Sequence, residues 1–452
     1  MRTADTTSVD AIRSKVFHRY LDVAYPLIRE AQGVHLSDSE GRDVIDASSG
    51  GALVTSLGHG DARIIAAAHD QAGRIGYLYN HHFTNDAQER LAARLLETAA
   101  PEMARVRFVS GGSEANETAL RLIRAYHVER GDRDRWRIIS PAQAYHGATM
   151  GALALTGRPH LQAPYGDYLA DHLHISPSTW RQDPTGGAAL AELDSIIEQV
   201  GPGSVAAFFC EPISGAALPA YSPPDRFWHG LAERRDAHGF LVCFDEIVTG
   251  IGRTGTWFAY QQLPIEPDIV TFGKGLGAGY APIAGVLCRN SVYQAIAEGS
   301  REFEHGHTWD GAPLPCAVGL AVIDAIVEDG LIDRVRTRGP VFRRDLAASL
   351  VDVPLVREVR GRGYLFGVEM VDPRDGTSIL PADLHVADLV DDLAYSHGVL
   401  VTSSHPNADG YASDQTVLAP AFTSSDAELD EMVDRFARAL RAVAARVSEK
   451  IG

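Results

Sequence analysis

Residues 240–244 (FLVCF) and residues 269–273 (IVTFG) decide the fold of this chain, because each apolar run ends directly in a residue with useful chemistry. Asp245 follows the first run, and Lys274 follows the second. Short apolar runs bounded by turn signals are typical of buried strands in a parallel sheet, and ligands of such sheets bind at the carboxyl ends of the strands. We therefore expect Asp245 and Lys274 to lie at one edge of a sheet.

The two side chains together suit pyridoxal 5'-phosphate (PLP). A lysine forms a Schiff base with the aldehyde of this cofactor, and a carboxylate keeps its pyridine nitrogen protonated. Asp245 stays ionised at the end of an apolar sheet when a positive charge such as the pyridinium faces it. Lys274, once displaced by a substrate amine, becomes the base that moves the Cα proton. Taken alone, the pair has ordinary alternatives, because Asp245 could cap a helix and Lys274 could be a solvated loop residue.

A glycine-rich turn earlier in the chain is a candidate phosphate site. A strand is expected at residues 105–109, and the sequence SGGSEANE at residues 110–117 opens a helix that continues through Tyr126. Backbone N–H groups at the start of a helix bind anions, and the helix dipole adds partial positive charge. Gly112 and Ser113 are therefore candidates for holding a phosphate. The alternative is a plain capping box, in which Ser113 acts with Glu114 or Glu117.

Two further strand-like runs end near residues that could serve the same site. Residues 136–140 form one run, and Tyr145-His146-Gly147 follows shortly after it. Tyr145 is a candidate for stacking on an aromatic ring, with a core or surface tyrosine as the alternative. Residues 205–210 lead into Glu211. Glu211 either meets the substrate site or pairs with a nearby arginine.

The segment at residues 245–258 (DEIVTGIGRTGTWF) and the later residues 282–285 (PIAG) complete a longer pattern around Lys274-Gly275. This pattern resembles the signature of class III aminotransferases, which are fold-type I PLP enzymes. The similarity extends over nearly the whole chain, through residues 58–60 (GHG) and residues 305–309 (HGHTW). The resemblance implies an α/β fold, with a large domain whose mostly parallel seven-stranded sheet is covered by helices. It also implies a smaller α+β domain made of both termini.

The resemblance also implies roles for individual residues. Lys274 resembles the Schiff-base lysine, Asp245 the partner of the pyridine nitrogen, and Ile247 the residue that packs on the ring face opposite Tyr145. Thr308 is similar to a hydroxyl that the partner subunit contributes to the phosphate, which implies a homodimer with shared active sites, or a tetramer. Soluble enzymes commonly form such closed two-fold assemblies. The full set of implied cofactor contacts is Gly112, Ser113, Tyr145, His146, Glu211, Asp245, Ile247, Lys274 and Thr308.

Composition limits the other possibilities. The chain has 452 residues, 45% of them hydrophobic, so it can bury a large core and exceeds the usual size of one domain. With 41 basic and 59 acidic residues its net charge is −18, which argues against nucleic acid or an anionic membrane as a partner. Four widely spaced cysteines favour reduced thiols over a zinc site, so no metal is expected. Residues 1–20 have no apolar core typical of a signal peptide, and we expect a cytoplasmic protein.

The alternation of strand and helix patterns predicts three segments. Residues 1–60 include an expected hairpin at residues 34–46 and form the first part of the small domain. Residues 61–330 alternate between strand and helix and form the large PLP-binding domain. Residues 331–452 complete the small domain, with strands expected between residues 355 and 370 and helices at about 383–397 and 426–447.

The substrate is less well defined by the sequence. Many members of the family bind a substrate carboxylate with an arginine of the C-terminal domain, because a guanidinium grips a carboxylate with two parallel hydrogen bonds. No arginine or lysine occurs between Asp375 and Asp434. Either Arg253, His405 or an arginine elsewhere in the chain takes that place, or one half-reaction uses an amine without an α-carboxylate or a carboxylate held by an unusual group.

Other pocket residues follow from their place in the family pattern. Leu53 falls where relatives often have an aromatic residue, so it leaves room for bulky amine donors. Tyr79 falls in a segment that neighbours the partner's site in relatives, with a polar turn between helices as the alternative. The predicted function is transamination between an amine or amino acid and a keto acid or aldehyde. A decarboxylase, epimerase, aminomutase or carbon–carbon bond-forming enzyme on the same scaffold remains the alternative, because one fold runs several reactions.

Overall fold

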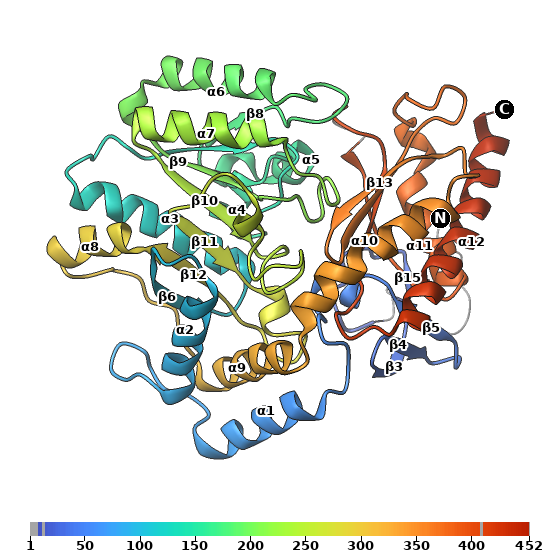
Figure 1. Ribbon diagram of the computed structural model, residues 1–452, viewed down its shortest axis with the longest axis horizontal. Helices are drawn as coiled ribbons and strands as arrows, with labels where there is room; N and C mark the ends of the chain where they lie inside the picture. Colours follow the sequence, from blue (N-terminus) through green and yellow to red (C-terminus); the bar gives the residue numbers. More distant parts are fainter. Residues whose placement is uncertain (1–7, 11–13, 407–409, 452) are drawn as a thin grey trace.

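The computed structural model describes residues 8–10, 14–406 and 410–451. Part of the stretch at residues 1–20, in which we expected no signal peptide, lies outside the described residues. The chain forms two lobes that lie side by side (Figure 1). Among the helices of the described segments, none combines the length and the apolar character needed to cross a membrane.

The larger lobe is built on a seven-stranded sheet. Its strands pair in the order β6-β12-β11-β10-β9-β7-β8, and only β12 runs antiparallel to its two neighbours. Every residue of β9, β10 and β11 is buried, as expected for strands covered on both faces. The expected mostly parallel sheet is therefore confirmed. The strands are β6 (Met103–Val109), β12 (Ala284–Arg289), β11 (Ile269–Phe272), β10 (Leu241–Glu246), β9 (Val205–Cys210), β7 (Arg137–Pro141) and β8 (Leu173–Ile175).

Helices cover both faces of this sheet. Successive side chains of a strand point to opposite faces, so strands that are apolar throughout have side chains to bury on both. Cys243 of β10 packs among residues of α3 (Gly112–Glu129) and α8 (Asn290–Glu298). Its neighbour Phe244 points to the other face, where its ring lies 5.5 Å from that of Trp228 in α7 (Asp225–His238). Other long helices on this lobe are α1 (Ala62–Arg74), α2 (Asp86–Thr98), α6 (Gly187–Val200) and α9 (Pro313–Glu328).

The smaller lobe contains two four-stranded sheets and uses both ends of the chain. β15 (Val399–Leu400) pairs in parallel with β5 (Asp43–Asp46), so an N-terminal and a C-terminal segment share one sheet. This pairing supports our proposal that residues 1–60 and 331–452 form one discontinuous domain. The other strands are β3 (Ile28–Gln32), β4 (His35–Asp38), β13 (Val356–Arg362), β14 (Leu365–Met370), β16 (Thr402–Ser404) and β17 (Gln415–Leu418).

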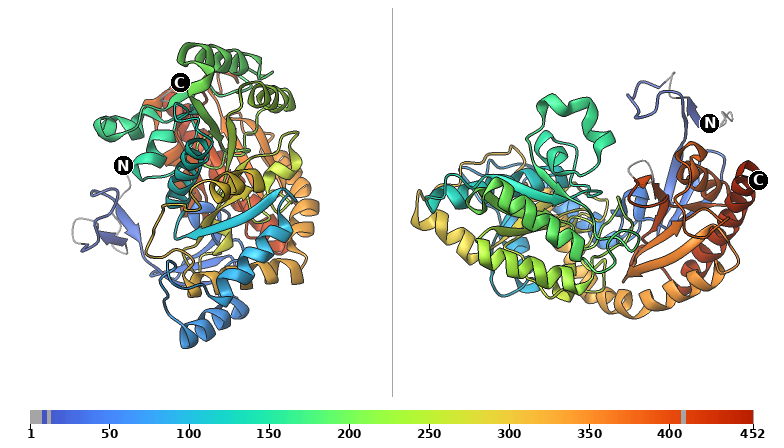
Figure 2. Two further views of the ribbon diagram at one scale, coloured as in Figure 1. Left: turned by 90° about the vertical axis from the view of Figure 1, so that its left-hand side faces the viewer. Right: turned by 90° about the horizontal axis from the view of Figure 1, so that it is seen from above.

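Helix α10 (Leu331–Ser349) runs from the larger lobe into the smaller one, where α11 (Val386–Ser396) and α12 (Asp426–Ile451) cover the sheets (Figure 1). A short N-terminal hairpin of β1 (Ser8–Asp10) and β2 (Ala24–Pro26) stands apart from both lobes (Figure 2). Shorter helices occur in the connections of the large lobe, α4 (Met150–Leu155) and α5 (Pro159–Gln162) among them. The expected hairpin is formed by β4 and β5.

Candidate active site

The strand pairings bring the candidate residues to one edge of the sheet. Asp245 of β10 lies opposite Thr271 of β11, and Lys274 follows Thr271 by three residues. On the other side of β10, Phe244 lies opposite Cys210, the last residue of β9, so Glu211 also emerges at this edge. Because these strands run in parallel, their carboxyl ends meet here, where open α/β sheets bind ligands.

Lys274 is half-buried and sits in a strained backbone conformation. Its φ of 39° lies in the left-handed region, which is unfavourable for a residue with a side chain. Burial lowers the pKa of its amine, and the Arg253 guanidinium lowers it further, while the acidic Asp245 and Glu211 act in the opposite direction. A buried amine with a lowered pKa is more readily present as the free base, which is the form that attacks a carbonyl or accepts a proton.

Three N–H groups hold the carboxylate of Asp245. Nδ1 of His146 lies 2.8 Å from Oδ2, Nδ2 of Asn116 donates to the same oxygen at 2.8 Å, and the backbone N–H of Ile247 donates to Oδ1 at 3.0 Å. Since an ionised carboxylate only accepts hydrogen bonds, the His146 proton lies on Nδ1. Donors to the charged form favour it, so Asp245 is prepared to face a cation.

The start of α3 forms a small cradle beside this carboxylate. A Cβ atom on Gly112 would lie 3.0 Å from the Ile247 side chain, so only glycine leaves this space free. The Ser113 hydroxyl accepts a hydrogen bond from the N–H of Ala148 at 3.0 Å. The N-cap of α3 is Gly111, which makes no side-chain cap, so the alternative of a capping box at Ser113 is wrong. Glu114 and Glu117 instead accept hydrogen bonds from the N–H groups of Ser110 and Gly151.

Tyr145 and Glu211 line the opposite side of the edge. Tyr145 is 40% exposed, so its ring is available to a ligand, and its N–H donates to Glu211 at 3.3 Å. The second carboxylate oxygen of Glu211 accepts from Gly215 at 2.8 Å. Burial raises the pKa of Glu211, while His146 opposes this shift. Glu211 is thus fixed by backbone groups beneath the site.

Thr308 is exposed on a loop that is anchored to the start of α3. His307 lies 3.1 Å from Glu114, and His305 lies 2.8 Å from the hydroxyl of Thr118. Asp310 forms an ion pair with Arg107. These contacts hold the loop in place while the Thr308 side chain remains exposed. Tyr79 belongs to a turn between α1 and α2, where its ring stacks on His81 at 4.6 Å.

Arg253 and His405, the two candidates for a substrate carboxylate, already have partners. The guanidinium of Arg253 is buried and donates to the carbonyls of Tyr364 and Pro420 and to the hydroxyl of Ser49. His405 lies 3.5 Å from Asp388 and 3.6 Å from Asp414, and these carboxylates raise its pKa to about 10.

Leu53 ends a short turn, η1 (Ser49–Leu53), in which the backbone angles of Gly50, Gly51 and Ala52 are not helical. The Ser56 hydroxyl, three residues later, donates to the carbonyl of Gly275 at 3.1 Å. Leu53 itself is 3% exposed and has a φ of 60°. It packs in an apolar cluster that draws on both lobes and also contains Ile213, Ala220, Ala259, Leu365, Val417 and Ala419.

Asn116 is the residue of this site to which the sequence alone assigned no role. It lies inside the quoted turn at residues 110–117, three residues after Ser113. Residues three apart on a helix share a face, and this spacing was the available signal. Asn116 therefore lies one turn after Ser113, on the same face of the helix.

Comparison with known proteins identifies the class of enzyme. Residues 18–440 match the family model of class III aminotransferases, so the chain belongs to this family. It is 33% identical to an uncharacterised aminotransferase of Bacillus subtilis (strain 168), covering 94% of this chain and 96% of the relative. It is 31% identical to a putrescine–pyruvate aminotransferase of Pseudomonas aeruginosa, covering 93% and 91%. Transamination is therefore favoured over the other reactions of the scaffold.

A solved structure agrees with this assignment. The omega transaminase of Pseudomonas jessenii in complex with PMP superposes with a TM-score of 0.90 and 28% identity, covering 98% of this chain and 99% of that one. The expected fold-type I architecture is confirmed. The protein is an aminotransferase, and its family is PLP-dependent and acts on small-molecule amines and keto acids.

Proposed function

We propose that this aminotransferase binds PLP covalently through Nζ of Lys274, with Asp245 facing the pyridine nitrogen. The residues fit the cofactor at both ends. Gly112 and Ser113 form a cradle at a helix start, where N–H groups favour a phosphate. At the other end, three N–H groups hold the buried carboxylate of Asp245, and a carboxylate buried in this way suits a partner of opposite charge.

The residues of the chain divide the chemistry between them. When bound, the cofactor would supply an aldehyde for the substrate nitrogen and a ring that takes up the electron pair left on the substrate carbon when its proton is removed. Nζ of Lys274 carries that proton, and burial favours the neutral amine that does so. The ring of Tyr145 supports one face of the cofactor and Ile247 the other. His146 holds Asp245 in place, and Glu211 lies beneath the site.

We propose amine donors without an α-carboxylate as one substrate class, with a keto acid or aldehyde as the acceptor. The guanidinium of Arg253 is occupied by two carbonyls and a hydroxyl, and the charge of His405 is balanced by two aspartates. The relative from Pseudomonas aeruginosa, named for putrescine and pyruvate, supports such a pairing of diamine and keto acid.

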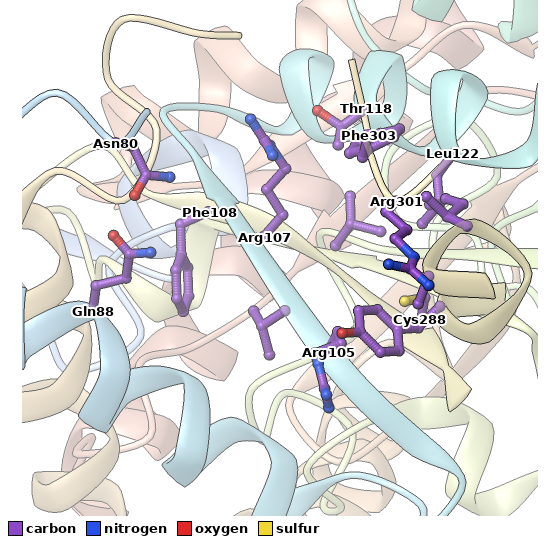
Figure 3. Close-up of a pocket in the computed structure, with 15 residues that line it drawn as sticks. Asn80, Gln88, Arg105, Arg107, Phe108, Thr118, Leu122, Cys288, Arg301 and Phe303 are labelled. Atoms are coloured by element: carbon purple, nitrogen blue, oxygen red, sulfur yellow. The ribbon is translucent and has the colours of Figure 1, made fainter. Parts of the chain in front are cut away.

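We propose further that two copies of the chain form a homodimer with shared active sites, in which Thr308 of each copy reaches the phosphate of the other. Four exposed aromatic side chains, Tyr77, Tyr79, Phe83 and Trp309, support an apolar contact surface. Next to them lies a pocket of about 480 Å³ along β6. Figure 3 shows Asn80 and Gln88 at one end of this pocket and Cys288 and Arg301 at the other. Its proximity to the Thr308 loop, through Thr118 and Phe303, supports coverage by the second copy.

The cell compartment that we propose is the cytoplasm. All four cysteines are buried and unpaired, which suits a reducing environment.

Borohydride reduction tests the cofactor assignment. Purified protein incubated with PLP is expected to turn yellow, and reduction followed by peptide mapping should place the label on Lys274. Lys274→Ala should lose this label and all turnover. A colourless protein, or a label on another lysine, would contradict the proposal.

Donor and acceptor screening tests the substrate class. Rates with a simple arylalkyl amine, 4-aminobutyrate, alanine and glutamate are compared with pyruvate as acceptor, or with 2-oxoglutarate when alanine is the donor. Amines without an α-carboxylate should be the best donors. A strong preference for glutamate over every amine would contradict the proposed class while leaving the PLP assignment intact.

A further inference from the structure

Asn116 joins the two ends of the candidate cofactor site. It is the fifth residue of α3 and is 1% exposed. Its Nδ2 donates to the backbone carbonyl of His146 at 2.5 Å and to Oδ2 of Asp245 at 2.8 Å. Ser113 precedes it by three residues, on the same face of the helix. One helical turn therefore carries both a phosphate-site hydroxyl and a donor to the carboxylate.

The orientation of the Asn116 amide is set by its surroundings. Both neighbours of Nδ2 are oxygen acceptors, so the reverse orientation would place Oδ1 against a carbonyl and a carboxylate. In the present orientation Oδ1 is buried, and within the described residues it has no hydrogen-bond partner. Leaving a buried acceptor unsatisfied is unfavourable. The two hydrogen bonds that Nδ2 donates, to His146 and Asp245, offset the cost of the unsatisfied Oδ1.

The contact with His146 extends the effect of Asn116 to the second donor of Asp245. Because Nδ2 holds the carbonyl of His146, it fixes the backbone from which the imidazole reaches Oδ2. The N–H of His146 is held in turn by the hydroxyl of Thr156 at 2.9 Å. Loss of the Asn116 amide would thus remove one donor and loosen another.

We propose that Asn116 is a positioning residue, which fixes the Asp245 carboxylate at a set distance from the Ser113 phosphate cradle. This inference rests on the proposed PLP function and goes beyond it, because it assigns the spacing of the site to one amide. The residue does not touch the reacting atoms. It acts through Asp245 and His146, so its removal should disturb how the cofactor is held and oriented more than how substrate binds.

Asn116→Leu is the main test, since leucine has a similar size and no donor. The dissociation constant for PLP is expected to rise about tenfold or more, as for the loss of one hydrogen bond to a charged group. The visible circular dichroism of the bound cofactor should change, because it reports the orientation of the ring. We expect kcat to fall about tenfold, while KM for the amine changes less than threefold.

Asn116→Asp gives a second, stronger test, because it places another carboxylate against Asp245 and should weaken PLP binding further. Asn116→Ser serves if the leucine variant does not fold. The matched control is His127→Gln, which alters another buried side chain of α3, one that contacts the carbonyl of Ala206 at 2.9 Å. This control should shift the melting temperature and leave the PLP dissociation constant and the dichroism unchanged.

Different outcomes would overturn PLP binding at Lys274 and the positioning role of Asn116. A wild-type protein that does not bind PLP at Lys274 would overturn the proposed function itself. A wild-type protein that binds PLP, with Asn116→Leu retaining the same dissociation constant and dichroism within twofold, would overturn only the role of Asn116. Equal effects of Asn116→Leu and His127→Gln on all readouts would also overturn it, because they would indicate a general loss of packing.

Discussion

Arg253 donates a hydrogen bond from its guanidinium to the hydroxyl of Ser49 at 3.1 Å, and this contact joins the two lobes. The same guanidinium donates to the carbonyls of Tyr364 at 3.1 Å and Pro420 at 2.6 Å. Arg253 follows the strand that carries Asp245, whereas its partners come from both ends of the chain. Its guanidinium also lies 4.6 Å from the ring centre of Phe422. The Arg253 side chain thus connects the edge of the large sheet that carries Asp245 to the N-terminal and C-terminal segments of the smaller lobe.

Replacing Arg253 should therefore reduce stability. Arg253→Met removes the donors and leaves buried carbonyls unsatisfied, at about 1–3 kcal/mol for each buried group. With two carbonyls left unsatisfied, we expect the free energy of unfolding to fall by about 2–6 kcal/mol. Denaturant unfolding of the wild type and the variant measures this change. Arg441→Lys, at an exposed ion pair with Asp352, is the control and should have little effect.

A second variant of Arg253 separates its stabilising role between the lobes from a role in substrate binding. Arg253→Lys keeps a charge but cannot span all three partners, so it should destabilise the fold while the KM values for amine and keto acid change by similar factors. A selective rise in KM for the keto acid alone would show that Arg253 grips a carboxylate instead.

The strands around Arg253 follow from the sequence, whereas the contacts of its side chain do not. The apolar runs before Asp245 and Lys274 predict strands correctly, because strands buried on both faces require continuous apolar sequence. Parallel pairing then brings strand ends together, so the edge of the sheet follows from the sequence as well. The direction in which a long side chain points does not follow, because it depends on segments hundreds of residues away. For Arg253 those segments carry Ser49, Tyr364 and Pro420.

Asn116 shows the same limit at shorter range. Its place one turn after Ser113 is visible in the sequence, but its partners Asp245 and His146 come from two other strand ends. The sequence therefore predicts which helix face Asn116 lies on, but the residues that this face contacts are known only from the folded sheet.

At Leu53, one substitution tests both the stability of the fold and the preference among amine substrates. Leu53→Ala leaves a cavity in the apolar cluster and should lower the free energy of unfolding by about 2–4 kcal/mol. If Leu53 forms the wall of the substrate pocket, the ratio of kcat/KM for an arylalkyl amine over isopropylamine should rise about tenfold, since a few methylene groups of space have that effect. Leu193→Ala, on the buried face of α6, is a control that should lose stability without changing the ratio.

His405 predicts a pH dependence of stability. Asp388 and Asp414 raise the pKa of this histidine to about 10. A histidine whose folded pKa is raised adds stability that is fully present below its unfolded pKa of about 6.5, and this stability is lost as the pH rises towards the folded pKa. The side chain is 40% exposed, so solvent screening limits the effect to about 1 kcal/mol.

We therefore expect His405→Gln to be less stable than the wild type at pH 6, with a difference that shrinks towards pH 9.5. Urea unfolding at several pH values measures this difference. His69→Gln is the control, because His69 is 87% exposed and its variant should show no such trend. A difference that grows with pH would contradict the charged pairing of His405.

Thr308 gives a prediction about the assembly. The residue is exposed on its own subunit, on the loop that His307 and Asp310 hold in place. If it completes the phosphate site of a second copy, Thr308→Val should weaken PLP binding about tenfold, through the loss of a hydrogen bond to a charged group. The protein itself should remain folded, because an exposed hydroxyl contributes little to stability.

Mixed dimers decide whether Thr308 acts on its own subunit or on its partner. Co-expression of Lys274→Ala chains with Thr308→Val chains yields dimers in which one site combines the intact Lys274 of one chain with the intact Thr308 of the other. With Thr308 acting across the interface, that site is complete, so each mixed dimer should bind one PLP with wild-type affinity and show about half the wild-type turnover. With Thr308 acting within its own chain, every site carries a defect, and PLP titration of differently tagged, purified mixed dimers would give only the weak affinity of the Thr308→Val protein.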